Sequence, residues 1–188
     1  MITIGITGHR NLKEQCVPYY RARIHDMLVS LKEKHEELLV YSALADGADR
    51  LVVEVAMELD IEYVAVLPMP KKIYVTDYDE ASTYIFNMLF NKAIWVIEIP
   101  LVEENTVTSI AIDSEERNLQ YEVAGQYMSD HCNILMALWD GEYSQLKGGT
   151  GEIVKYHLAK THYSLYHLLV SRSKGLTNDM VEFKIFET

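Results

Sequence analysis

The chain opens on an apolar, β-branched run at residues 2–7 that stops at Gly8, His9 and Arg10. Such a run is typical of a strand buried on both faces, as in a parallel sheet. In open α/β sheets, ligands bind beyond the carboxyl ends of these strands. A glycine there lets backbone N–H groups approach a ligand, and an arginine can form two hydrogen bonds with a phosphate. The opening therefore predicts a parallel sheet with a ligand site at its carboxyl edge.

Strand-like and helix-like patterns alternate along the rest of the chain. Further strands are predicted at residues 38–42, 63–67, 94–99 and 133–138, and two late strands at 168–171 and 181–186. Helical spacing predicts helices at 17–34, from Asp46 as N-cap to 59, at 80–92, at 114–130, and from the glycines near 150 to about 159. The alternation predicts one α/β domain over residues 1–188, with a Rossmann-like, doubly wound, mostly parallel sheet flanked by helices.

Short-range spacing also predicts local roles within these helices. Ile24, Leu28 and Leu31 form one apolar stripe of the first helix. In the helix at 114–130, the residues expected to be buried are Leu119, Val123, Ala124 and Tyr127. Caps are expected from Asp77 and Asp79 for the helix at 80–92, and from Asp113 with Glu116 for the helix at 114–130. Arg50 and Glu54 have the spacing of a helical ion pair.

The charge and the cysteines limit the classes of partner. A net charge of −11 repels a phosphate-rich polymer, so no nucleic acid is expected as a partner, whereas a small phosphorylated ligand is compatible with a local positive pocket. The two cysteines, Cys16 and Cys132, lack metal-type spacing, and the histidines form no ligand set, so no metal and no cofactor is expected. Without a signal peptide or a membrane-length apolar run, a cytoplasmic protein is expected.

A glycine-rich segment, G-G-T-G at residues 148–151, is the strongest phosphate candidate. The helix that follows offers unpaired N–H groups and the positive end of its dipole. The segment is not a Walker loop, because Lys147 precedes the glycines and no Lys-Ser/Thr pair follows. We expect Gly148, Gly149 and Thr150 to bind phosphate together with Gly8, His9 and Arg10. The alternative is an ordinary loop before a helix.

Acidic, basic and aromatic residues at other strand ends suit the rest of a nucleotide. The candidates for ribose hydroxyls are Asp46, Asp49 and Asp140, and those for charge or base contacts are Arg50, Arg117 and Tyr121. Arg117 and Tyr121 lie four residues apart on one helix face, where Gly125 continues that face and leaves room for a base to stack. Helix capping and solvated side chains explain the same residues equally well.

Taken together, these segments resemble one family. They are I-T-G-H-R at 6–10, S-A-L-A-D-G-A-D-R-L at 42–51, L-P-M-P at 67–70, Y-V-T-D-Y at 74–78, Arg117 with Tyr121 and A-G at 124–125, and W-D-G at 139–141 through G-G-T at 148–150. The family is the Smf/DprA–LOG (SLOG) superfamily of Rossmann-like domains. The nearest branch has a T-G-H-R start, an A-[ED]-G-A-D-R segment and a W-D-G…G-G-T end. The resemblance covers residues 1–160 and adds four residues to the expected ligand contacts: Ser42, Gly47, Pro68 and Tyr78.

The resemblance implies a nucleotide or nucleotide-derived ligand across the strand ends and a homo-oligomer. Some members are ligand sensors, including domains that detect NAD-derived cyclic signals in phage defence. LOG members are phosphoribohydrolases that use P-G-G-x-G-T-x-x-E with a catalytic glutamate. Here Lys147 replaces the proline and the glutamate follows sooner, as Glu152. We therefore expect a ligand sensor or sink. The alternatives are a phosphoribohydrolase with Glu152 or Asp140 as the catalytic acid, and an oligomeric interaction module with a vestigial pocket.

Overall fold

The computed structural model describes residues 1–143, 148–160, 164–172 and 183–186, and these residues have the predicted α/β fold. They contain a sheet of seven strands in the order β4-β3-β2-β1-β5-β6-β7. Neighbouring strands are parallel except β7, which is antiparallel to β6. The strands are β1 (Ile2–Gly8), β2 (Leu38–Ser42), β3 (Glu62–Leu67), β4 (Trp95–Glu98), β5 (Ile134–Trp139), β6 (Ser164–Leu169) and β7 (Phe183–Phe186).

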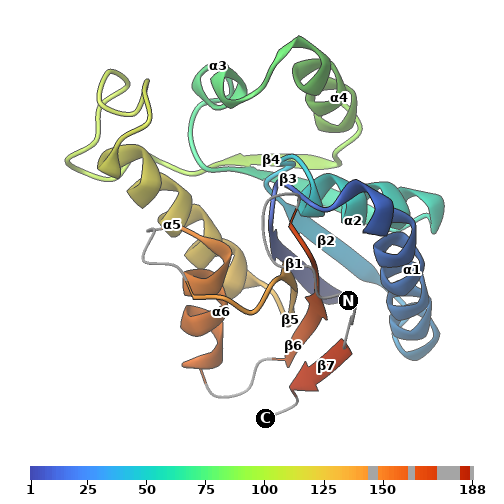
Figure 1. Ribbon diagram of the computed structural model, residues 1–188. Helices are drawn as coiled ribbons and strands as arrows, with labels where there is room; N and C mark the ends of the chain where they lie inside the picture. The colour runs from blue at the N-terminus through green and yellow to red at the C-terminus, as the bar shows by residue number, and fades with distance from the viewer. Residues whose placement is uncertain (144–147, 161–163, 173–182, 187–188) are drawn as a thin grey trace.

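Helices cover both faces of the sheet. Figure 1 shows α1 and α2 on one face, α5 and α6 on the other, and α3 and α4 beyond the edge that β4 forms. Their bounds are α1 (Val17–Lys34), α2 (Ala48–Glu58), α3 (Lys71–Tyr74), α4 (Glu80–Phe90), α5 (Glu115–His131) and α6 (Thr150–Leu158). Two 3-10 turns, η1 (Glu14–Cys16) and η2 (Val75–Asp77), precede α1 and α4.

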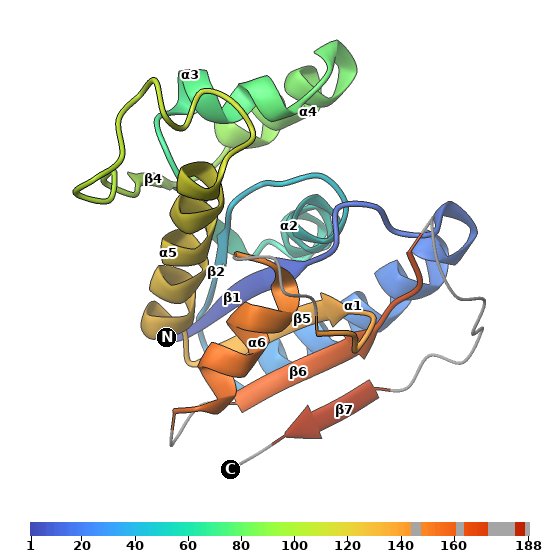
Figure 2. The same cartoon turned by 60° about the vertical axis from the view of Figure 1, so that its left-hand side comes forward.

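Alternate residues of the strands point to opposite layers, as the two-residue period of a strand requires. On β5, Met136 and Leu138 join the core beneath α1 and α2, whereas Leu135 and Ala137 join the core beneath α6. β1 lies at the centre, between β2 and β5, so its carboxyl end at Gly8 lies in the middle of the sheet edge. Figure 2 shows the N-terminal ends of α5 and α6 near this edge.

Several predicted details are confirmed and others are wrong. The stripe of Ile24, Leu28 and Leu31 is buried, as predicted. In α5 the predicted inward face is confirmed in part: Ala124 is buried, Val123 and Tyr127 are partly buried and pack against the core, and Leu119 is only partly buried. Polar side chains of the same helix, Arg117, Gln120 and Ser129, are buried as well. The spacing of apolar residues cannot predict buried positions that polar side chains occupy.

The late strands and two helix caps also differ from the prediction. β6 begins at Ser164 rather than at residue 168, because it pairs with β5 over its whole length. The capping box at Asp113 is wrong, since the Ser114 hydroxyl accepts the N–H of Arg117. Asp46 is not the N-cap of α2; Gly47 holds that position. Both cysteines are free thiols. Among the described residues, no helix has the length and apolar character needed to cross a membrane.

Candidate functional site

A cavity of about 830 Å³ opens at the carboxyl edge of the sheet, between the ends of β1, β2 and β3 and the helices α5 and α6. Its volume lies in the range of small-molecule sites, which is ~300–1,000 Å³. The predicted residues in its wall are Gly8, Arg10, Asp49, Pro68, Arg117, Tyr121, Gly148, Gly149 and Thr150. Segments from five parts of the chain therefore meet where the strand pattern predicts a ligand.

The glycine segment is held against α5 before it enters α6. Gly148 has a φ of +74°, and a Cβ there would lie 2.7 Å from the carbonyl oxygen of Asn118, so only glycine fits. Gly149 is the N-cap residue of α6 and provides no side-chain cap. Among the described residues, the N–H groups of Gly149, Thr150 and Gly151 have no acceptor. Unpaired N–H groups at a helix start form an anion site.

The two candidate catalytic carboxylates lie outside the cavity wall and have other partners. The Glu152 carboxylate accepts the N–H of Gly148 at 3.0 Å, which fastens the glycine segment to the first turn of α6. The Asp140 carboxylate lies 2.9 Å from the Nε2 of His9 and also accepts the N–H of Glu142. Burial lowers the pKa of His9, although Asp140 opposes this shift. His9 and Asp140 thus join the ends of β1 and β5.

Two arginines and a tyrosine converge on one carboxylate, Asp77, which lies in the cavity wall. An Nη2 of Arg10 lies 2.9 Å from Oδ2 of Asp77, and an Nη2 of Arg117 lies 2.6 Å from its Oδ1. The Tyr121 hydroxyl donates to Oδ2 as well. Burial alone raises the pKa of Asp77, but the Tyr121 hydroxyl and the two guanidiniums outweigh it and hold that pKa below its usual value.

Arg117 is 4 % exposed and its remaining contacts are to backbone oxygens. It donates to the carbonyl oxygen of Ile110 and, at 3.3 Å, to that of Ile73. Arg117 therefore joins α5 to the loop before it and to α3. Since its guanidinium is buried, charged and in the cavity wall, it can interact strongly with an anionic ligand.

Aromatic rings lie beside the guanidiniums of Arg10 and Arg50. The guanidinium carbon of Arg10 lies 5.4 Å from the ring centroid of Tyr121 and 5.9 Å from that of Tyr78. The guanidinium carbon of Arg50 lies 4.8 Å from the Tyr78 ring. Burial raises the pKa of Tyr121 to about 12, so its hydroxyl stays a donor at neutral pH. Neither Tyr78 nor Arg50 lines the cavity, and the Tyr78 ring lies beside the guanidiniums of both Arg10 and Arg50.

Residues 42–49 form a tight turn around the carboxylate of Asp49. This carboxylate accepts the N–H of Ala43 at 3.0 Å and the hydroxyl of Ser42 at 3.2 Å. The turn includes Leu44 in the left-handed region, with a φ of +58°. Ser42 lies behind the cavity wall while Asp49 reaches it. Burial raises the pKa of Asp49 to about 6 despite these hydrogen bonds.

This raised pKa predicts a pH-dependent effect of an Asp49→Asn substitution. Between pH 4 and 6 the folded protein holds the Asp49 proton more tightly than the unfolded chain, so wild-type stability falls as pH rises through this interval. Asparagine does not ionise. Relative to wild type, the variant should gain about 2 kcal/mol in free energy of unfolding between pH 4 and pH 7. Urea unfolding of both proteins at the two pH values measures this, and an unchanged difference would contradict it.

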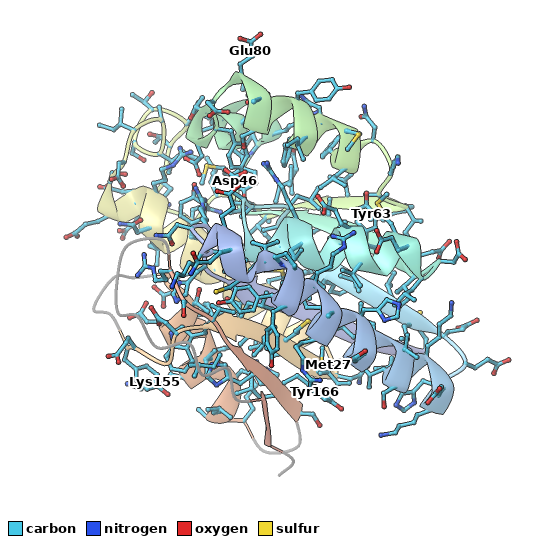
Figure 3. All side chains as sticks on the ribbon, turned by 45° about the vertical axis from the view of Figure 1, so that its right-hand side comes forward. Met27, Asp46, Tyr63, Glu80, Lys155 and Tyr166 are labelled. Carbon is cyan, nitrogen blue, oxygen red and sulfur yellow. The ribbon has the colours of Figure 1, made fainter. Side chains whose placement is uncertain are left out.

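Asp46 and Arg50 form a second ion pair, which faces α4. An Nη1 of Arg50 lies 2.5 Å from Oδ1 of Asp46, and the Ser82 hydroxyl donates to the same oxygen. Figure 3 shows Asp46 below α4. The predicted pair of Arg50 with Glu54 is wrong, because Glu54 binds Arg21.

Nine of the predicted residues lie in the cavity wall, but its central acid, Asp77, was not predicted as a site residue. Asp77 was expected to cap α4, and that prediction is wrong because the Asp79 side chain accepts the N–H of Ser82. The sequence contained a signal for this role. One aspartate is enough to cap α4, so the second aspartate at its start was available for a different partner. The predicted residues outside the wall are His9, Ser42, Asp46, Gly47, Arg50, Tyr78, Asp140 and Glu152.

Comparison with known proteins shows the fold alone. No family model matches the chain, and no curated protein sequence matches it. Among solved structures, the chain is similar to DNA processing protein A (DprA) from Streptococcus pneumoniae, with a TM-score of 0.57 and 12 % sequence identity. The match covers 89 % of this chain and 50 % of that protein, so the chain spans about half the length of the DprA structure. The chain has a DprA-like Rossmann fold, as its resemblance to the SLOG superfamily implies.

Proposed function

We propose that the chain binds a nucleotide-derived small molecule in this cavity and acts as a ligand sensor or sink. One observation carries the proposal. The free N–H groups that begin α6 and the guanidiniums of Arg10 and Arg117 meet at one cavity in a chain of net charge −11. Donors gathered at one cavity of an acidic protein favour a small anion over a polyanion, because the surrounding field repels the latter.

The cavity wall suggests how the parts of a nucleotide would be arranged. The phosphate would lie on the N–H groups of Gly149 and Thr150, where the helix dipole favours negative charge. Tyr121 suits a base, because an aromatic ring can stack on it. The gap expected at Gly125 is absent, because Ile153 fills it: a Cβ at Gly125 would lie 2.5 Å from the Cδ1 of Ile153. The motifs at residues 6–10, 42–51 and 139–150 support membership of the T-G-H-R branch of the superfamily.

The same geometry favours binding over hydrolysis. Phosphoribohydrolase activity needs a carboxylate beside the ribose, but Glu152 is fastened to the N–H of Gly148 and Asp140 to His9. Neither side chain lines the cavity. Hydrolysis of a nucleoside monophosphate therefore stays the second candidate, supported by family resemblance rather than by geometry.

The proposal extends to partners. We expect no binding of single- or double-stranded DNA at physiological salt, although the structural neighbour is named for DNA processing. We expect a cytoplasmic protein. We also expect a homo-oligomer, and light scattering on the purified chain measures its molar mass.

Mass spectrometry of the purified protein tests the function. Denatured protein releases whatever it carried, and fresh protein is then incubated with nucleoside monophosphates, NAD and cyclic NAD derivatives. A ligand recovered intact, with a thermal shift and no turnover, is the expected result. Release of free base would support the hydrolase instead. Protein without ligand, thermal shift or turnover would support the interaction module with a vestigial pocket.

A further inference from the structure

The cavity already contains an anion of its own. The Asp77 carboxylate lies in the wall and takes hydrogen bonds from Arg10, Arg117 and Tyr121. A guanidinium is a donor of the kind that binds phosphate, and those of Arg10 and Arg117 are the cationic side chains that line the described part of the cavity. An anionic ligand that reached these donors would meet the position that the Asp77 carboxylate occupies.

The segment that carries Asp77 is short and outside the sheet. Asp77 ends η2, which joins α3 to α4 beyond the β4 edge, while Arg117 and Tyr121 lie on α5 (Figure 1). The buried rings of Tyr74 and Phe86 hold α3 and α4 in the core, so the apolar contacts do not depend on Asp77. The turn itself is closed by the N–H of Tyr78 on the carbonyl of Val75, at 3.2 Å, and by the Thr76 hydroxyl on the carbonyl of Ile73, at 2.7 Å, and neither bond involves the Asp77 side chain. The Asp77 side chain can therefore leave α5 without unfolding α3 or α4.

We propose that Asp77 is a built-in competitor for the ligand, and that the anionic group of the ligand replaces its carboxylate on Arg10 and Arg117. The inference rests on the proposed function and assigns these donors to an anionic group such as a phosphate. A dianionic phosphate attracts two guanidiniums more strongly than one carboxylate does, and the released Asp77 regains water. Ligand binding then frees η2 from α5, which gives the protein a conformational signal of occupancy.

An Asp77→Asn variant tests the competition. The amide keeps the size of the side chain but has no charge, so it competes weakly for the arginines. We expect AMP, or the monophosphate that binds wild type best, to bind about tenfold more tightly, and inorganic phosphate likewise. Weaker or unchanged binding would overturn the inference, because Asp77 would then hold the arginines in place for the ligand or contact it directly.

An Asp113→Asn variant is the matched control. Asp113 also lines the cavity, and the described contacts include no ion pair between it and either arginine. Removing its charge changes the field of the pocket but frees no guanidinium. We expect a change of about threefold or less. An equal gain in both variants would mean that general charge, and not competition at Arg10 and Arg117, limits affinity.

Two further measurements keep the inference testable if Asp77→Asn folds poorly. Tyr121→Phe keeps the ring and removes only the hydroxyl that donates to Asp77, so affinity for the monophosphate should rise about threefold. In wild type, amide hydrogen exchange at residues 75–79 should become faster when ligand saturates the protein. Unchanged or slower exchange would contradict displacement.

These outcomes separate the inference from the proposed function. Nucleotide binding by wild type with no gain in the Asp77 or Tyr121 variants would overturn the competition alone. Absence of binding by wild type and by every variant would overturn the proposed function together with it. Binding by the Asp77→Asn variant alone would support both, since the competitor would then keep the wild-type site closed.

Discussion

A Gly149→Asp substitution should weaken nucleotide binding by about 100-fold or more while leaving the folded protein at least as stable as before. Gly149 is the N-cap of α6, with φ −74° and ψ 155°, a conformation open to any residue. Aspartate is among the best N-cap residues and accepts N–H groups of the first turn, so stability should rise by a few tenths of a kcal/mol, roughly. The same carboxylate would occupy the N–H groups proposed for phosphate and repel it. Calorimetric titration and thermal unfolding measure the two effects.

Gly149→Asn is the matched control for charge. Asparagine caps a helix as aspartate does but brings no negative charge. It should lose less affinity than the aspartate variant, because it competes for N–H groups without repelling the phosphate. If Gly149→Asp bound the nucleotide as well as wild type does, the phosphate would not lie at the start of α6.

A Gly47→Ala substitution should destabilise the fold by about 3 kcal/mol or more. Gly47 has a φ of +77°, and a Cβ there would lie 2.3 Å from the carbonyl oxygen of Arg10 and 2.5 Å from that of His9. Both are backbone atoms, so they cannot move away from the new methyl group as a flexible side chain could. The His9 carbonyl also accepts the N–H of Ala48, so the start of α2 and the end of β1 are pressed together. Urea unfolding gives the loss directly.

Gly141→Ala separates the close contact from the backbone strain. Gly141 also has a positive φ, +84°, but the nearest atom to its Cβ would be Cδ1 of Leu169 at 3.7 Å. It should therefore cost only the strain of the left-handed conformation, about 1 kcal/mol. Equal losses in the two variants would mean that the contact with Arg10 and His9 contributes nothing.

The sheet could be predicted because its strands carry a strong local pattern. Buried parallel strands are short apolar runs, and β1, β2 and β5 read that way without reference to the rest of the chain. β6 was misplaced because Tyr166 and His167 interrupt its leucines, and only pairing with β5 makes these residues a strand. The polar residues of the inward face of α5 were missed for a related reason, since Arg117 is buried by its partners and not by apolarity.

The position of the site could be predicted, but not its internal contacts. The carboxyl ends of parallel strands must meet at one edge, so Arg10 and the glycines at 148–149 could be placed there from topology alone. Pairing between distant side chains has no local signal. His9 with Asp140, and Asp77 with Arg117, join residues that are 131 and 40 positions apart. Gly8 was predicted to let a ligand approach the backbone. Its missing side chain also leaves room for Ala48, because a Cβ at Gly8 would lie 2.3 Å from the Cβ of Ala48.

The decisive measurement is a calorimetric titration of the wild-type chain with nucleoside monophosphates and, in parallel, with the same nucleosides lacking phosphate. If the start of α6 and the two arginines hold a phosphate, at least one monophosphate should bind about 100-fold more tightly than its nucleoside. Equal affinity for the two, or no binding of any monophosphate, would contradict a nucleotide phosphate in this cavity.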